Sequence, residues 1–102
     1  MRHERDRSQD LFHIHLRMSE AINREVLAIV GEDGMREFVL SYSGDSAEAE
    51  ALLALGARYE AGRAERQEVV DACVAVIEDW KRAARQHVAQ RERHTPPRAA
   101  RR

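Results

Sequence analysis

Two short groups of residues have the types and spacing that chemistry could use. Arg82 and His87 are five positions apart, and a histidine can act as a general acid or base near neutral pH. Asp45 and Ser46 follow a glycine, and Glu48 comes three positions after Asp45. A serine hydroxyl in such a place can carry a covalent group. The spacing of Asp45 and Glu48 also fits the capping box that begins a helix.

The residues around Ser46 resemble a known family. Residues 38–55, with Asp45 and Ser46 near their centre, are similar to the region around the phosphopantetheine-bearing serine of acyl and peptidyl carrier proteins. That resemblance implies a four-helix bundle that carries its prosthetic group on Ser46. Ala47 stands where the family usually has Leu or Ile, and Glu50 stands where its second helix has an apolar residue. Ordinary helix capping produces the same Gly-Asp-Ser sequence, so the carrier function is kept as an alternative.

Two shorter resemblances involve other segments. Arg82 and His87 fit the Arg-x4-His spacing of HEPN-type ribonucleases, helical dimers in which the resemblance implies RNA cleavage by paired arginine and histidine side chains. Ala83 stands where that family commonly has a polar residue, and a chain with sixteen arginines and five histidines produces this spacing easily by chance. Residues 42–44 are similar to the Trp-x-Gly turn of WXG-type helical hairpins. We predict that the chain is not an enzyme and has no catalytic residues.

The sequence gives no metal or cofactor site. His13 and His15 lie about 200° apart around a helix, so they cannot bind one metal ion from the same face. The single Cys73 cannot form an intramolecular disulfide, and no Cys/His spacing resembles a structural zinc site. Residues 1–10 are charged throughout, and no window approaches the roughly 18 consecutive apolar residues of a membrane span. We therefore expect a cytoplasmic protein with no cofactor, no metal and no membrane association.

Apolar residues recur with the 3.6-residue period of a helix in several segments, and glycine-containing runs separate these segments. The pattern predicts helices over residues 8–30, 35–42, 46–61 and 64–91. We expect breaks at 31–34 and 43–45. Gly62 suggests a further break, which leaves open whether residues 46–93 form one long helix or two. The predicted fold is an all-α bundle of three or four antiparallel helices.

Charge is distributed unevenly along the chain. Residues 10–79 hold fifteen acidic residues against six arginines, whereas residues 80–102 hold eight basic residues against one acid. This asymmetry suggests a basic end that binds an anionic partner, either nucleic acid or protein. Leu, Ile, Val and Phe together number only 21 of the 102 residues. The core is therefore small, and we expect dimerisation or a larger protein partner to complete it.

These features predict a non-catalytic protein–protein interaction or regulatory module. We expect a charged N-terminal arm at 1–7, a helical bundle domain at 8–93 and a basic disordered tail at 94–102. The alternatives are a nucleic-acid-binding accessory protein that uses the Arg-rich tail, and a carrier protein modified at Ser46. The expected partner-binding residues are three on the apolar stripes and eight in the basic end: Ile22, Ile77, Trp80, Lys81, Arg82, Arg85, Arg91, Arg93, Arg98, Arg101 and Arg102.

Overall fold

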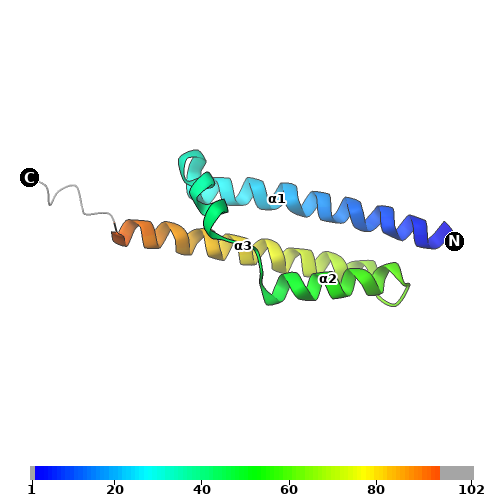
Figure 1. Ribbon diagram of the computed structural model, residues 1–102. Coiled ribbons are helices and arrows are strands. Elements are labelled where there is room, and N and C mark those ends of the chain that lie inside the picture. Colours follow the sequence, from blue (N-terminus) through cyan, green and yellow to red (C-terminus); the bar gives the residue numbers. More distant parts are fainter. Residues whose placement is uncertain (1, 95–102) are drawn as a thin grey trace, which may run out of the picture.

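The structure of the chain is a computed structural model that describes residues 2–94. Three helices contain nearly all of these residues: α1 (Arg2–Ser41), α2 (Ala47–Glu60) and α3 (Arg66–His94). No strand occurs among the described residues, so the predicted all-α class is confirmed. Figure 1 shows α1 above α3 and α2 below it, and both pack along α3 to form a small helical bundle. Of the predicted tail at 94–102, every residue after His94 lies outside the described part.

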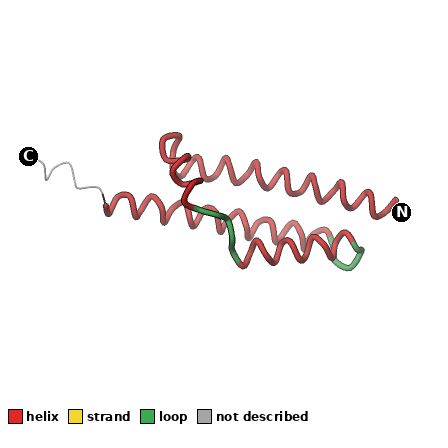
Figure 2. Tube along the Cα trace, in the orientation of Figure 1, coloured by secondary structure: helices red, strands yellow, loops and turns green. Residues whose placement is uncertain are grey.

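Gly31 divides α1 into two helical parts. Gly31 lies inside α1, but its φ of 78° and ψ of 167° are not helical. Glycine adopts a positive φ without the penalty that a Cβ would bring. The break predicted at 31–34 is therefore confirmed and is located at Gly31. Residues 32–41 turn back from the end of the long part, as Figure 2 shows. There Phe38 is buried against Val26 and Ala84, which places this short part on α3.

The other helix boundaries differ from the prediction by a few residues. α1 begins at Arg2 rather than at Ser8, because the charged residues of the expected arm include no glycine or proline to interrupt a helix. The chain turns again between α2 and α3, where Gly62 has a φ of 78° and its N–H donates to the carbonyl of Tyr59. Residues 46–93 therefore contain two helices rather than one.

Ser46, rather than Asp45, caps α2. The backbone of Ser46 is extended, and its Oγ accepts the N–H of Ala49 at 3.1 Å. The expected capping box of Asp45 and Glu48 is therefore wrong by one residue. Asp45 belongs to the preceding turn instead, where its N–H donates to Ser43 Oγ at 3.2 Å. The capping hydroxyl satisfies an N–H of the first helical turn that has no partner inside the helix.

The core consists of two clusters joined by shared neighbours. The first lies where the three helices meet and contains Ile14, Leu52, Tyr59, Val69, Cys73 and Val76. The second lies between the two parts of α1 and α3 and contains Val26, Phe38 and Ala84. Ile22 and Trp80 pack against both clusters. These two residues, which were expected to bind a partner, thus connect the two halves of the core.

Candidate interaction surface

Trp80 holds the linker between α1 and α2 against α3. Its ring meets Tyr42 edge-on at a centroid distance of 4.5 Å and meets Phe38 at 6.0 Å. Gly44, with a φ of 80°, lies directly against the indole, since a Cβ there would be 2.8 Å from Trp80 Cζ2. Trp80 is only partly buried and also lines an open cavity. It therefore packs mainly inside the chain while one edge stays at the surface.

Arg82 takes part in a polar contact that fixes the end of α1. The Tyr42 hydroxyl donates to Asp79, and Arg82 Nη1 lies 3.1 Å from the other oxygen of the same carboxylate. Burial, followed by the hydrogen bond to Asp79, raises the pKa of Tyr42 to about 12. The Asp79 side chain is largely buried, and its two oxygens bind Tyr42 and Arg82 respectively. Arg82 stabilises this contact and is not directed at His87.

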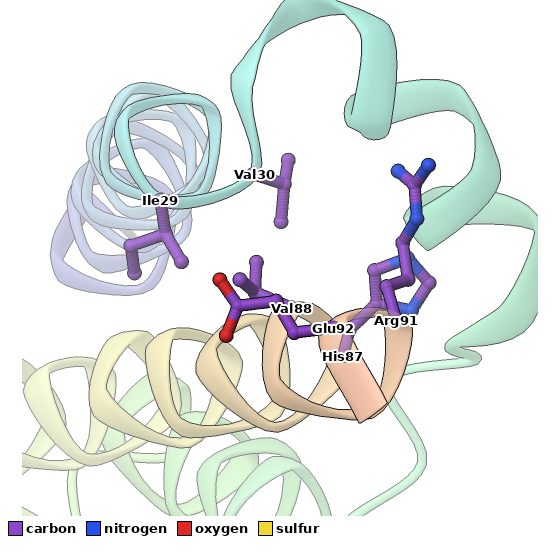
Figure 3. A pocket seen from close by; sticks show the side chains of 6 residues that line it. All are labelled: Ile29, Val30, His87, Val88, Arg91 and Glu92. Atoms are coloured by element: carbon purple, nitrogen blue, oxygen red, sulfur yellow. The ribbon is translucent and has the colours of Figure 1, made fainter. Parts of the chain in front are cut away.

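His87 and Arg91 lie beside a pocket near the break in α1. Figure 3 shows this pocket of about 300 Å³, with two side chains of α1 facing four of α3: Ile29, Val30, His87, Val88, Arg91 and Glu92. The His87 ring packs against Phe38 at a centroid distance of 5.5 Å. Its Nε2 is buried 3.5 Å from Glu37 Oε1 without making a hydrogen bond, and Arg91 Nε lies 3.3 Å from the same oxygen.

The structure therefore does not bring the two residues of the Arg-x4-His spacing together. Five positions along a helix correspond to about 140° of rotation, so Arg82 and His87 leave α3 in different directions. Arg82 pairs with Asp79 on its own helix, whereas His87 faces Glu37 of α1. The two residues of this spacing therefore belong to two separate contacts in the structure.

Several basic residues of α3 face acidic residues of the same chain. Lys81 Nζ lies 3.3 Å from Glu78 and 3.9 Å from Glu25, and the second contact joins α3 to α1. Together with the contacts of Arg82 and Arg91, these pairs match much of the positive charge on this helix. Arg85 and Arg93 are exposed. The remaining predicted basic residues lie outside the described part of the chain: Arg98, Arg101 and Arg102.

Large apolar side chains remain exposed on all three helices. Their exposed fractions run from 41 to 80% in Phe12, Leu16, Leu27, Val39, Leu40, Leu53 and Val74. The sequence pattern places Phe12, Leu16 and Leu27 at the edge of the α1 stripe, and the expected surface residues did not include them. The width of that stripe could have predicted their exposure. One neighbouring helix covers only part of a wide apolar arc, so the residues at its edge stay exposed.

Two open apolar cavities lie between the helices. A cavity of about 310 Å³ is lined by Ser19, Ile22, Asn23, Val26, Met35, Val39 and Trp80. Another of about 250 Å³ is lined by Ile14, Arg17, Met18, Arg66, Val70, Cys73, Val74 and Ile77. The expected surface residues are thus divided, with Ile22 and Trp80 on the first cavity and Ile77 on the second. An open apolar cavity beside exposed apolar side chains is typical of a surface that another molecule covers.

Among the described residues, no group of three histidine, cysteine, aspartate or glutamate side chains could hold a metal ion. Within residues 2–94, no helix combines the length and the apolar character needed to cross a bilayer.

No family model, curated protein sequence or solved structure matches the chain.

Proposed function

We propose that this chain is a non-catalytic helical module for protein–protein interaction or regulation. The observation that carries the proposal is the combination of seven exposed large apolar side chains with two open apolar cavities along α1 and α3. Covering such a surface removes apolar area from water, which is the main driving force of protein association. A module of this kind acts by binding, in a reducing cytoplasmic setting, through its apolar surface and its basic C-terminal end.

The polar side chains of the two candidate chemical groups support the same proposal. Ser46 caps α2, Arg82 bonds Asp79, and His87 packs on Phe38. Each of these side chains has a structural contact that accounts for its position without a reaction. The exposed apolar side chains face water in the single chain, and a binding role accounts for their exposure directly.

The test is purification of the tagged chain from its native cells in buffers of low and high salt. We expect a protein at fixed stoichiometry, either a second copy or another chain, that stays bound at about 0.5 M salt, because apolar contacts are not screened. Val74→Lys and Leu53→Lys should each be compared with Ala75→Lys and Ala54→Lys, which add the same charge at neighbouring exposed alanines. Loss of the bound protein with Val74→Lys or with Leu53→Lys, and with neither alanine control, supports the module. Retention with all four variants, or no bound protein, contradicts it.

Nucleic-acid binding by the basic end is the second candidate, and the exposure of Arg85 and Arg93 favours it. Phosphate contacts release counterions, so this binding should weaken steeply as salt rises. Recovery of nucleic acid only at low salt, and its loss when Arg85 and Arg93 are changed to Glu, would support this second candidate.

A further inference from the structure

Most of the exposed apolar side chains lie on one surface, here named the Asn23 face. Its members come from α1 and α2: Phe12, Leu16, Asn23, Leu27, Val39 and Leu53. The four residues of the long part of α1 fall within about 60° of one another around the helix. They form a stripe about four turns long in which the polar Asn23, itself exposed, lies between Leu16 and Leu27.

Two contacts place the remaining members beside this stripe. Val39 lines the same 310 Å³ cavity as Asn23, which brings the short part of α1 to the edge of the stripe. On α2, Gly56 packs against Leu11, since a Cβ at Gly56 would be 3.4 Å from Leu11 Cδ2. Leu53 lies one turn before Gly56 and therefore near the Phe12 end of the stripe.

Charged residues along the Asn23 face differ between its two halves. Glu20 lies one turn after Leu16, and Glu50 lies one turn before Leu53, so the half that contains Phe12 has an acidic edge. Arg24 lies one turn before Leu27, and Arg36 lies one turn before Val39, so the other half has a basic edge. All four charged side chains are exposed. The face thus has apolar side chains toward both ends, and Glu20 and Arg24 lie on either side of Asn23 between them.

Such a surface is complementary to itself when one copy is turned around. A two-fold axis through the middle of the face places the acidic half of each copy on the basic half of the other. It also brings Asn23 of one copy to Asn23 of the second copy. A side-chain amide both donates and accepts, so two asparagines can bond each other across such an axis, and a single asparagine in an apolar helical seam can fix its register.

From this self-complementarity we infer that the Asn23 face binds the Asn23 face of a second copy of the chain, antiparallel, with the two-fold axis at Asn23. This inference rests on the proposed interaction function and names the partner. Glu20 and Glu50 of each copy face Arg24 and Arg36 of the other. Leu16 and Leu27 of the two copies cover one another beside the axis, and the 310 Å³ cavity is closed from outside.

The first experiment tests the axis by sedimentation equilibrium of the full chain at micromolar concentrations. Wild type is expected to be a dimer. Asn23→Asp places two like charges at the axis and should weaken dimerisation about tenfold or more. Gln86→Glu adds the same charge on an exposed part of α3 and should leave the dimer unchanged. Because Asn23 is exposed in the single copy, circular dichroism of Asn23→Asp should show wild-type helix content.

The second experiment tests the charge pattern with two double variants. The Glu20→Arg/Glu50→Arg chain and the Arg24→Glu/Arg36→Glu chain should each dimerise poorly alone, since like charges then face each other across the axis. An equimolar mixture should recover a dimer that contains one copy of each. Circular dichroism of each variant alone checks that its helices are intact.

Three results would overturn the inference. One is a wild-type chain that stays monomeric at about 100 μM, a concentration far above the Kd of an ordinary stable dimer. Another is a dimer that Asn23→Asp leaves intact and Val74→Lys dissociates, which would move the contact to the 250 Å³ cavity. The third is a mixture of the double variants that recovers no dimer. A different protein that binds the chain and is lost with Leu53→Lys would reject self-association while leaving the interaction function in place.

Discussion

The Tyr59 hydroxyl donates a hydrogen bond of 2.7 Å to the carboxylate of Asp10, a residue 49 positions earlier in the chain. Arg66 donates from Nε to the same carboxylate oxygen at 2.8 Å. A single side chain of α1 thus joins α2 and α3 at one end of the bundle. The hydrogen bonds from Arg66 and Tyr59 lower the pKa of Asp10 below its ordinary value.

Removing this junction should destabilise the chain measurably. Asp10→Asn loses the charge and should lower the free energy of unfolding by about 1 kcal/mol, a modest value because Arg66 is largely exposed. Tyr59→Phe keeps the buried ring and should cost about 0.5–1.5 kcal/mol. Urea denaturation followed by circular dichroism measures both. The double variant should cost less than the sum of the two, and full additivity would show that the two side chains act independently.

The lowered pKa of Asp10 gives a defined dependence of stability on pH. A carboxyl whose folded pKa lies below its unfolded value of 3.8 stabilises the fold above pH 3.8. That contribution should be lost as the pH falls from 3.8 through the folded pKa. Urea midpoints of wild type and Asp10→Asn measured between about pH 2 and 7 should therefore converge at the acid end. A difference that stays constant down to pH 2 would contradict this account.

Tyr42 should make the fold sensitive to alkali. Its folded pKa of about 12 lies above the ordinary value of 10.0, so the neutral phenol stabilises the fold fully below pH 10 and the contribution is lost as the pH rises through 12. The chain has two tyrosines, and burial raises the pKa of Tyr59 as well. Absorbance at the tyrosinate band should therefore stay low at pH 10 in folded protein. Half-ionisation of either tyrosine at pH 10 in folded protein would show that its pKa is not raised.

Gly44 and Gly31 should respond differently to alanine. Both have positive φ, so each substitution strains the backbone and should cost about 1–3 kcal/mol. Only at Gly44 does a new Cβ meet a ring, 2.8 Å from Trp80, whereas nothing lies within 4 Å of a Cβ at Gly31. Trp80 is the sole tryptophan, so its fluorescence reports the difference. We expect a shifted emission in Gly44→Ala and an unchanged one in Gly31→Ala.

Alanine at Ser46 should destabilise α2, and alanine at Asp45 should not. Ser46→Ala removes the bond to the N–H of Ala49 and should cost about 0.5–2 kcal/mol, whereas Asp45→Ala leaves that cap in place and should cost less than about 0.5 kcal/mol. Thermal unfolding of the two variants compares them. Intact mass of the protein from its native cells should equal that of the unmodified chain. An added phosphopantetheine group on Ser46 would instead establish the carrier function.

The helices and the principal breaks could be predicted from the sequence because both depend on local features. The period of apolar residues marks α1 and α3, and Gly31 and Gly62 interrupt helices through their own backbone freedom. The cap was misplaced by one residue because Asp45 and Ser46 are both good capping residues, and the choice between them depends on where the turn before α2 ends.

The contacts of the candidate site could not be predicted in the same way. Asp79 bonds Tyr42 across 37 positions, and Asp10 bonds Arg66 across 56. No local pattern in the sequence pairs such distant residues. The sequence therefore showed the basic end only as a charged surface, although Lys81, Arg82 and Arg91 have acidic partners nearby. An apolar stripe likewise does not show how much of its width the chain itself covers, so the contacts of Trp80 with Tyr42 and Phe38 could not be predicted from the sequence.

The position of α3 in the chain has a consequence for synthesis. Both other helices pack on α3, yet α3 is the last of the three to leave the ribosome. Until it emerges, Phe38 and Leu52 have none of their α3 neighbours, and the nascent chain presents bare amphipathic helices of the kind that chaperones hold. A truncation that ends before Val69 should therefore remain bound to the cell's holding factors, because the surface on which α1 and α2 assemble has not yet been made.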